Sequence, residues 1–234
     1  MAESRAEKHP HIPIRHVMDR IVLGGSDGVI EMIAMTAALN GAGVGVRTIL
    51  LAGFAFAAAG ALSMFFSTYL SRRSELDALR IDVARERMEI ETEPEEERAE
   101  LEELLKKEGY AQREIDVIMS RLVKDKRMWL REQLSHELGV RMEDLQSDPL
   151  TRPASAGLSF LALSLLVLSP YALGLGLGAA LVLSVGMSLV ALFALGSRAL
   201  VPRHFSLAGG LESAGIGALA AGLLYGVGLL VSAL

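Results

Sequence analysis

The chain has 234 residues, 51% of them apolar, and a formal net charge of −5 at pH 7. This composition is too apolar for an ordinary soluble domain, and the acidic balance argues against nucleic acid as a partner. Because the chain has no cysteine, a disulfide framework, a thiolate metal site and a cysteine nucleophile are excluded. Carboxylate, methionine and histidine side chains remain as candidate metal ligands, and they suit hard or borderline divalent cations.

The charged residues are concentrated in one part of the chain. Residues 71–150 hold 22 of the 28 acidic residues and 15 of the 23 basic ones, which gives this segment a net charge of −7 and the remainder +2. We therefore expect an acidic soluble module, residues 71–150, inserted between two hydrophobic segments, residues 1–70 and 151–234.

Five apolar stretches are long enough to cross a bilayer as helices, since its hydrocarbon core takes about 20 residues. They lie at about 20–40, 48–70, 155–176, 179–201 and 207–232. The polar N-terminal segment lacks the apolar core of a signal peptide, so we expect no cleavage there. The predicted fold is all-α: a polytopic membrane protein with five transmembrane helices and the acidic helical module between the second and third of them.

Basic residues gather on one side of these spans. They are Lys8, Arg15, Arg20, Arg72, Arg73, Arg152, Arg198 and Arg203, whereas the opposite side offers only Arg47. By the positive-inside rule, the N-terminus and the acidic module are predicted to be cytoplasmic.

The acidic module is predicted to be helical throughout. No glycine or proline interrupts the chain between Gly60 and Pro94, so the second span is expected to continue into the module as one helix. Pro94 suits the first turn of the next helix, and Gly109 suits its end. Two further helices are expected over about 112–123 and 126–137, and no strand pattern is present.

Glutamates three residues apart stand out in the first two helices of the module. Glu86 and Glu89, and then Glu97 and Glu100, each share a helix face, where two carboxylates can bind one cation. Most glutamates on a charged helix are solvated or paired with a basic residue four positions away. The two pairs, together with Glu137, therefore indicate a metal site only as a set.

Asp27 and Glu31 are carboxylates within the first predicted span. A carboxylate at membrane depth is costly, so it normally faces a cavity or a partner and has a function. Their spacing places both on one helix face, and Met64 in the second span could add a thioether ligand. Two structural alternatives compete with this interpretation: Glu31 pairs with Arg47 or another polar group, or Asp27 caps a helix broken after the preceding Gly-Gly-Ser.

Several short motifs follow one another along the chain. They are SDG in the first span, AGALSM and YLSRRSE in the second, RERMEIETEPEEERAE in the module, WL and HELG near its end, SPY in the third span and GALAAGLLYGVG in the last. Each is weak alone, but in this order, over about residues 20–232, they resemble the vacuolar iron transporter family.

The resemblance implies a five-span homodimer that exchanges Fe²⁺ and related divalent cations, such as Mn²⁺, Co²⁺ and Zn²⁺, for protons across the lipid bilayer. The cations are then transported substrates, no cofactor is permanently bound, and the protein is not an enzyme. By motif, Asp27 and Met64 match residues of the family's ion path. The glutamates that match the family's cytoplasmic three-helix metal-binding domain are Glu86, Glu89, Glu97, Glu100 and Glu137.

Two departures from the family pattern bear on the metal. Phe56 stands where family members often carry a glutamate, and Glu31 could restore that carboxylate from the facing helix. Gln133 and Leu134 stand where the family has a pair of methionines. Losing two thioethers removes soft ligands, so selectivity is expected to shift from Fe²⁺ toward harder ions such as Mn²⁺, or metal binding by the module to weaken.

The leading hypothesis is a proton-coupled exporter that moves Fe²⁺ or Mn²⁺ out of the cytoplasm. The alternative is a metal-sensing or metal-buffering membrane protein without transport, in which the spans only anchor the module, and a third interpretation is a structural scaffold. For the membrane, we expect the bacterial plasma (inner) membrane, with a vacuolar membrane as the alternative.

Overall fold

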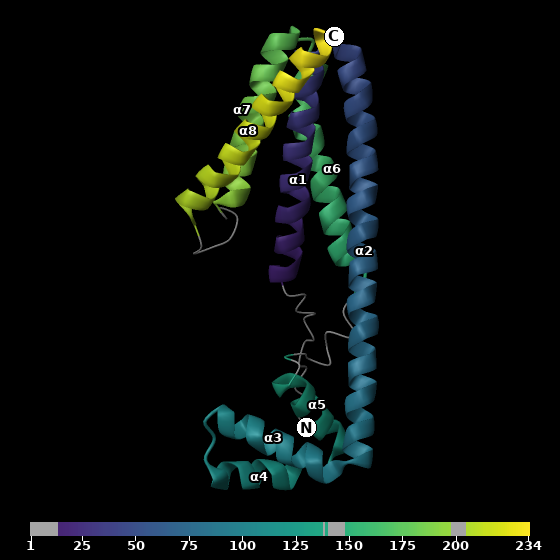
Figure 1. The fold of residues 1–234 in the computed structure, drawn as a ribbon, viewed down its shortest axis with the longest axis vertical. Coiled ribbons are helices and arrows are strands. Elements are labelled where there is room, and N and C mark those ends of the chain that lie inside the picture. The colour runs from purple at the N-terminus through teal and green to yellow at the C-terminus, as the bar shows by residue number, and fades with distance from the viewer. Residues whose placement is uncertain (1–13, 138, 140–147, 198–204) are drawn as a thin grey trace, which may run out of the picture. The chain divides into compact units, whose positions relative to one another are not determined.

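The computed structural model describes residues 14–137, 139, 148–197 and 205–234, and these residues form eight helices and no strand. In chain order the helices are α1 (Ile14–Gly41), α2 (Val46–Thr92), α3 (Pro94–Lys107), α4 (Gln112–Leu122), α5 (Lys126–His136), α6 (Thr151–Ala172), α7 (Leu177–Gly196) and α8 (Leu207–Ser232) (Figure 1). The all-helical prediction is confirmed for this part of the chain.

The chain divides into two compact units. The first, which we call the membrane unit, comprises residues 1–69 and 150–234, and the second, the acidic unit, comprises residues 70–149. Helix α2 contributes residues to both units, because no proline or glycine interrupts it between Gly60 and Thr92.

Among the described residues, five helices, α1, α2, α6, α7 and α8, are long and apolar enough to cross a membrane, as many as the sequence predicted. At 47 residues, α2 is about 70 Å long, whereas a bilayer core is about 30 Å thick. The part of α2 in the membrane unit is therefore sufficient to span, and Glu86 lies beyond it.

Three spans differ in their bounds from the prediction. Helix α1 begins at Ile14, about six residues earlier than expected. Helix α6 begins and ends about four residues earlier than expected, because Gly174, with φ +72°, provides the left-handed turn after it. Helix α7 ends at Gly196, and Lys8, Arg198 and Arg203, on which the predicted orientation partly rests, lie outside the described residues.

Helix α1 is the centre of the membrane unit and packs on α6, α7 and α8 (Figure 1). A Cβ added to Gly28 would clash with the backbone carbonyl of Phe160 on α6, and one added to Gly228 on α8 would clash with that of Ala38. The Ser164 hydroxyl also donates to the carbonyl oxygen of Gly28, at 3.1 Å. The small residues therefore let these helices approach backbone to backbone, as is common in membranes.

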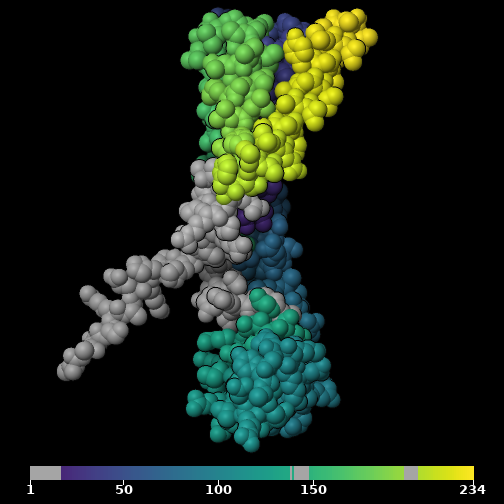
Figure 2. Space-filling model, turned by 90° about the vertical axis from the view of Figure 1, so that its left-hand side faces the viewer, coloured from purple at the N-terminus to yellow at the C-terminus, as the bar shows by residue number. Residues whose placement is uncertain are grey.

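Helices α7 and α8 lie side by side in the membrane unit (Figure 2), where Gly196 and Gly209 meet in close contact. Helix α2 packs on α6 through Gly60, against which the ring of Phe160 lies, and through Phe56, whose ring centroid is 6.3 Å from that of Phe160.

The acidic unit is built from α3, α4, α5 and the C-terminal turns of α2. Its apolar core contains Ile90, Leu101, Ile115, Met119 and Leu134, contributed by all four helices. As predicted, Pro94 begins α3, and Gly109 follows its end with φ +97°. Helix α5 begins at a cap, since the Asp125 carboxylate accepts from the backbone N–H of Arg127 at 2.9 Å.

Candidate functional site

The five predicted glutamates of the acidic unit, hereafter the five-glutamate cluster, come from three helices. Glu86 and Glu89 are on α2, Glu97 and Glu100 are on α3, and Glu137 is the C-cap residue of α5. Only 3% of Glu86 and 6% of Glu97 is exposed, Glu89 is half-buried, and Glu100 and Glu137 are exposed.

Glu86 and Glu97 are buried because each lies one turn before a core residue of its own helix. Ile90 follows Glu86 and Leu101 follows Glu97 at a spacing of four, so the apolar stripe that forms the core also turns the carboxylates inward. The two side chains share a hydrogen bond. A bond between two carboxyl groups requires a proton between them.

Burial and repulsion between the carboxylates oppose the ionisation of Glu86 and Glu97. Burial, followed by repulsion from Glu137 and Glu97, raises the pKa of Glu86 to about 8. Burial also raises the pKa of Glu97, although the hydrogen bond from Glu86 opposes this change, while Glu100, Glu89 and Glu137 add repulsion. The proton therefore resides on Glu86, and Glu97 accepts.

The cluster is a set of neighbours that repel one another rather than a closed cage. Among the described residues, no three acidic or histidine side chains converge closely enough to hold a metal ion. Like charges that lack a counterion keep apart, and a divalent cation would reverse that repulsion. Glu86 Oε1 is buried and has no hydrogen-bond partner in the described part of the chain. A carboxylate oxygen of this kind suits a hard divalent cation as a ligand.

One residue in contact with the cluster was not anticipated there. Gln133 is completely buried on α5, and its Nε2 donates to Glu97 Oε2 at 2.7 Å, while its Oε1 accepts from Trp129 Nε1 at 3.1 Å. From the sequence, Gln133 stands out only as a missing thioether. The spacing of Trp129 and Gln133, one helical turn apart, is the signal that could have revealed the pairing.

His136, next to Glu137, does not extend the cluster. Its Nδ1 lies 2.6 Å from Glu108 Oε1, and its Nε2 lies 3.3 Å from Glu132 Oε2. The two carboxylates occupy opposite ring nitrogens, so they cannot share one cation with this imidazole.

Asp27 and Glu31 lie in the middle of α1, which is continuous from Ile14 to Gly41, so the alternative that Asp27 caps a broken helix is wrong. Glu31 is exposed and Asp27 half-buried, whereas Val29 and Thr36, on the opposite face, are fully buried. Within the described residues, the two carboxylates interact electrostatically only with each other, and Glu31 has no pairing with Arg47.

Met64 is half-buried on α2, and Phe56, two turns earlier, packs its ring against Phe160 of α6. Phe56 therefore contributes to helix packing at the position where a carboxylate was expected from the family pattern.

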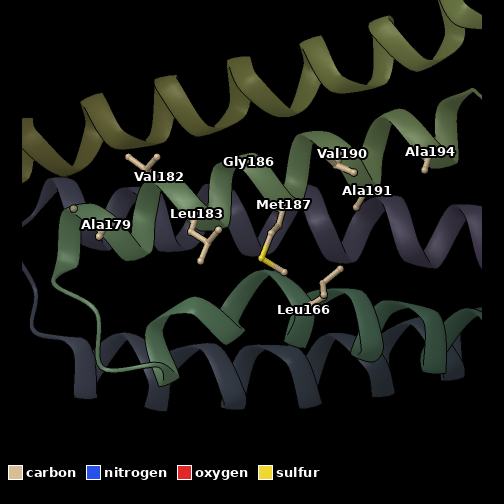
Figure 3. Close-up of a pocket in the computed structure, with 10 residues that line it drawn as sticks. Leu166, Ala179, Val182, Leu183, Gly186, Met187, Val190, Ala191 and Ala194 are labelled. Atoms are coloured by element: carbon tan, nitrogen blue, oxygen red, sulfur yellow. The ribbon is translucent and has the colours of Figure 1, made fainter.

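An apolar groove of about 870 Å³ lies along α7 (Figure 3). Leu166 of α6 and Val182, Met187 and Val190 of α7 line it, together with glycines and alanines. It contains no carboxylate or imidazole, so it offers a divalent cation no hard ligand.

Comparison with known proteins gives one consistent result. The model of the VIT family matches residues 18–229. Vacuolar iron transporter 1 of Oryza sativa subsp. japonica is 32% identical over 233 residues, which cover 96% of this chain and 91% of that protein. Vacuolar iron transporter 1 of Arabidopsis thaliana is 33% identical over 223 residues, or 92% of this chain and 86% of that protein. With a match over nearly all of its length, the chain belongs to the VIT family.

Proposed function

We propose that this protein transports divalent metal ions across a membrane, with Fe²⁺ as a substrate, and that it is not an enzyme. The relatives are named as iron transporters, which supports metal as the cargo. The observation that carries the proposal is the pair Asp27 and Glu31 in the middle of α1, a helix apolar enough to cross a membrane, without an ion partner among the described residues. Carboxylates in this position normally mark an ion pathway.

The proposed direction is out of the cytoplasm, in exchange for protons. The five-glutamate cluster collects the cation on the cytoplasmic side, and Asp27, Glu31 and Met64 take it up within the membrane. Each carboxylate holds either the cation or a proton, because its single negative charge cannot stabilise both. Metal binding therefore releases protons, and protonation releases metal. This links the two fluxes.

The proposal includes a homodimer. Glu31 is exposed on the outer face of α1, where lipid would leave its charge without a partner. A second copy of the chain that covers this face would enclose Asp27 and Glu31 between the two subunits and remove them from lipid. We place the protein in a bacterial plasma membrane or, as in the relatives' names, a vacuolar membrane.

The test is metal flux into proteoliposomes with and without an imposed proton gradient, comparing Fe²⁺ with Mn²⁺. We expect flux that depends on the gradient in the natural sequence and falls to background in Asp27→Asn and in Glu31→Gln. Glu212→Gln is the matched control, because Glu212 is an exposed carboxylate near the N-terminal end of α8. Its flux should be normal.

The same experiment separates transport from the alternative function. A metal sensor or buffer needs only the five-glutamate cluster, so it would bind metal but carry none across the membrane. Absence of flux for every divalent cation, with metal binding retained, would replace the transporter by the sensor or buffer. Normal flux in Glu31→Gln would restrict the membrane site to Asp27.

A further inference from the structure

We propose that Gln133 is a positioning residue of the five-glutamate cluster, which holds the Glu97 carboxylate in the orientation that receives a divalent cation. This inference rests on the proposed function, because it takes the cluster to bind metal. The family pattern has a methionine at this position, and the inference gives the Gln133 amide a role of its own there.

The contacts of Gln133 join three helices of the acidic unit in a line. Trp129 and Gln133 are on α5, Glu97 is on α3, and Glu97 shares a hydrogen bond with Glu86 on α2. All four side chains are at most 6% exposed. Water therefore does not compete for these bonds, and breaking one leaves a buried polar group without a partner.

Trp129 fixes which end of the amide faces the cluster. An indole N–H only donates, so the Gln133 atom beside it must be the oxygen, and the nitrogen must then face Glu97. The amide N–H in turn requires an accepting oxygen on Glu97. The hydrogen bonds thus point in one direction: Trp129 donates to Gln133, and Gln133 donates to Glu97. This donation favours the charged form of the Glu97 carboxylate.

Gln133 acts through Glu97 and not as a ligand. Its nitrogen has no lone pair for a metal, and its oxygen already accepts from Trp129. With Oε2 of Glu97 held at 2.7 Å, the rotation of the carboxylate is restricted. Outer partners that orient metal ligands in this manner typically change the affinity by about 10- to 100-fold when they are removed.

The test measures Mn²⁺ binding by the full-length protein in detergent, from the electron paramagnetic resonance signal of the free ion. We compare the natural sequence with Gln133→Leu, Glu97→Gln and the double variant. Gln133→Leu should weaken binding by about 10-fold or more. In the Glu97→Gln background it should have no further effect, because the residue through which it acts is already altered.

Two additional variants separate positioning from folding. Trp129→Phe keeps a ring in the core but removes the N–H that orients the amide, and it should weaken Mn²⁺ binding in the same direction. Met119→Leu changes the same core without touching the line, and it should leave the affinity unchanged. Thermal unfolding of every variant shows which of them is destabilised.

The affinities of these variants separate the positioning role of Gln133 from the proposed function. Unchanged affinity in Gln133→Leu, or an equal loss in both backgrounds, would overturn the positioning role while leaving the proposed function standing. Equal affinity in the natural sequence and in Glu97→Gln would show that Glu97 does not bind Mn²⁺, and this inference would fail. Absence of Mn²⁺ binding by the natural sequence would in addition overturn the collecting step of the proposed function.

Discussion

In the proposed function, Glu86 is the residue at which protons and metal compete most directly in the acidic unit. Its pKa of about 8 means that it is protonated in the metal-free protein at neutral pH. A cation that enters the cluster must displace this proton, because a carboxylic acid is a poor ligand. Metal affinity is thereby tied to pH through one identified group.

We predict that Mn²⁺ binding by the cluster strengthens as the pH rises from 6 to 8, by about tenfold per pH unit if one proton is released. Above pH 8 the dependence should level off, since Glu86 is then ionised before metal binds. Isothermal titration in buffers of different ionisation enthalpy counts the released protons. An affinity that is independent of pH over this range would contradict the assignment.

A second prediction concerns the stability of the metal-free protein. The pKa of Glu86 is raised on folding, so the folded state binds the proton more tightly than the unfolded state does. The resulting contribution is fully present below the ordinary glutamate pKa of 4.5 and is lost as the pH rises through about 8. Glu86→Gln should therefore be no more stable than the natural sequence at pH 4 and more stable at pH 8, as measured by thermal unfolding. A constant difference would argue against the raised pKa.

The metal preference of the cluster should follow its ligand atoms. Replacing Gln133 and Leu134 by methionine together introduces two thioethers, one of them at the position that contacts Glu97, which favours softer cations. We predict that the ratio of Co²⁺ to Mn²⁺ affinity rises, even though the loss of the Gln133 hydrogen bond weakens both. Competition titrations give this ratio directly, and Leu134→Ile serves as a control without sulfur.

At the scale of the helices, local signals in the sequence were sufficient for most boundaries. Pro94 and Gly109 delimit α3 because a ring without an N–H suits the first turn and a positive φ suits a residue past the last. The length of α2 followed from the absence of any such signal. The end of α6 was misplaced because two glycines close together, Gly174 and Gly176, both suit a helix end, and only Gly174 has the positive φ.

The contacts between helices could not be predicted from local signals in the sequence. A hydrophobic span shows little difference between its faces. The sequence therefore indicated that Asp27 and Glu31 share a helix face, but not that this face lies opposite the buried face of α1. The role of Gln133 depends on Glu97, which is 36 residues away, and no periodicity reports a pairing at that distance. Phe56 was likewise identified as a departure, but its packing on Phe160 emerged from the fold.

Two glycines of α8 offer a test of the close helix packing. A Cβ on Gly228 would clash with the backbone carbonyl of Ala38 on α1, whereas a Cβ on Gly226 meets nothing within 4 Å. Gly228→Ala should therefore lower the thermal stability of the detergent-purified protein. Gly226→Ala should leave it unchanged or raise it by up to about 1 kcal/mol, since alanine favours the helix. Equal behaviour of the two variants would mean that α1 and α8 do not approach as described.

At the scale of the whole molecule, the proposed dimer predicts which face of α1 meets a second copy. The chain has no cysteine, so single cysteines can be introduced without a background. Ala34 lies one turn from Glu31 on its face of α1, and Ala34→Cys should give a disulfide-linked dimer on oxidation in the membrane. Val182→Cys, exposed on α7, should not. Cross-linking at Val182 alone would assign the contact to the apolar groove.

The chain contains a single tryptophan, and its indole N–H is bonded to Gln133. Any light emitted by tryptophan thus comes from a position two hydrogen bonds away from the Glu97 carboxylate and three away from Glu86. The fluorescence of the unlabelled protein should accordingly change as the cluster fills with cation, and this change should be absent in Glu97→Gln. In vesicles, the occupancy of the cluster could then be followed optically while metal crosses the membrane, so that filling and flux are timed against each other in one sample.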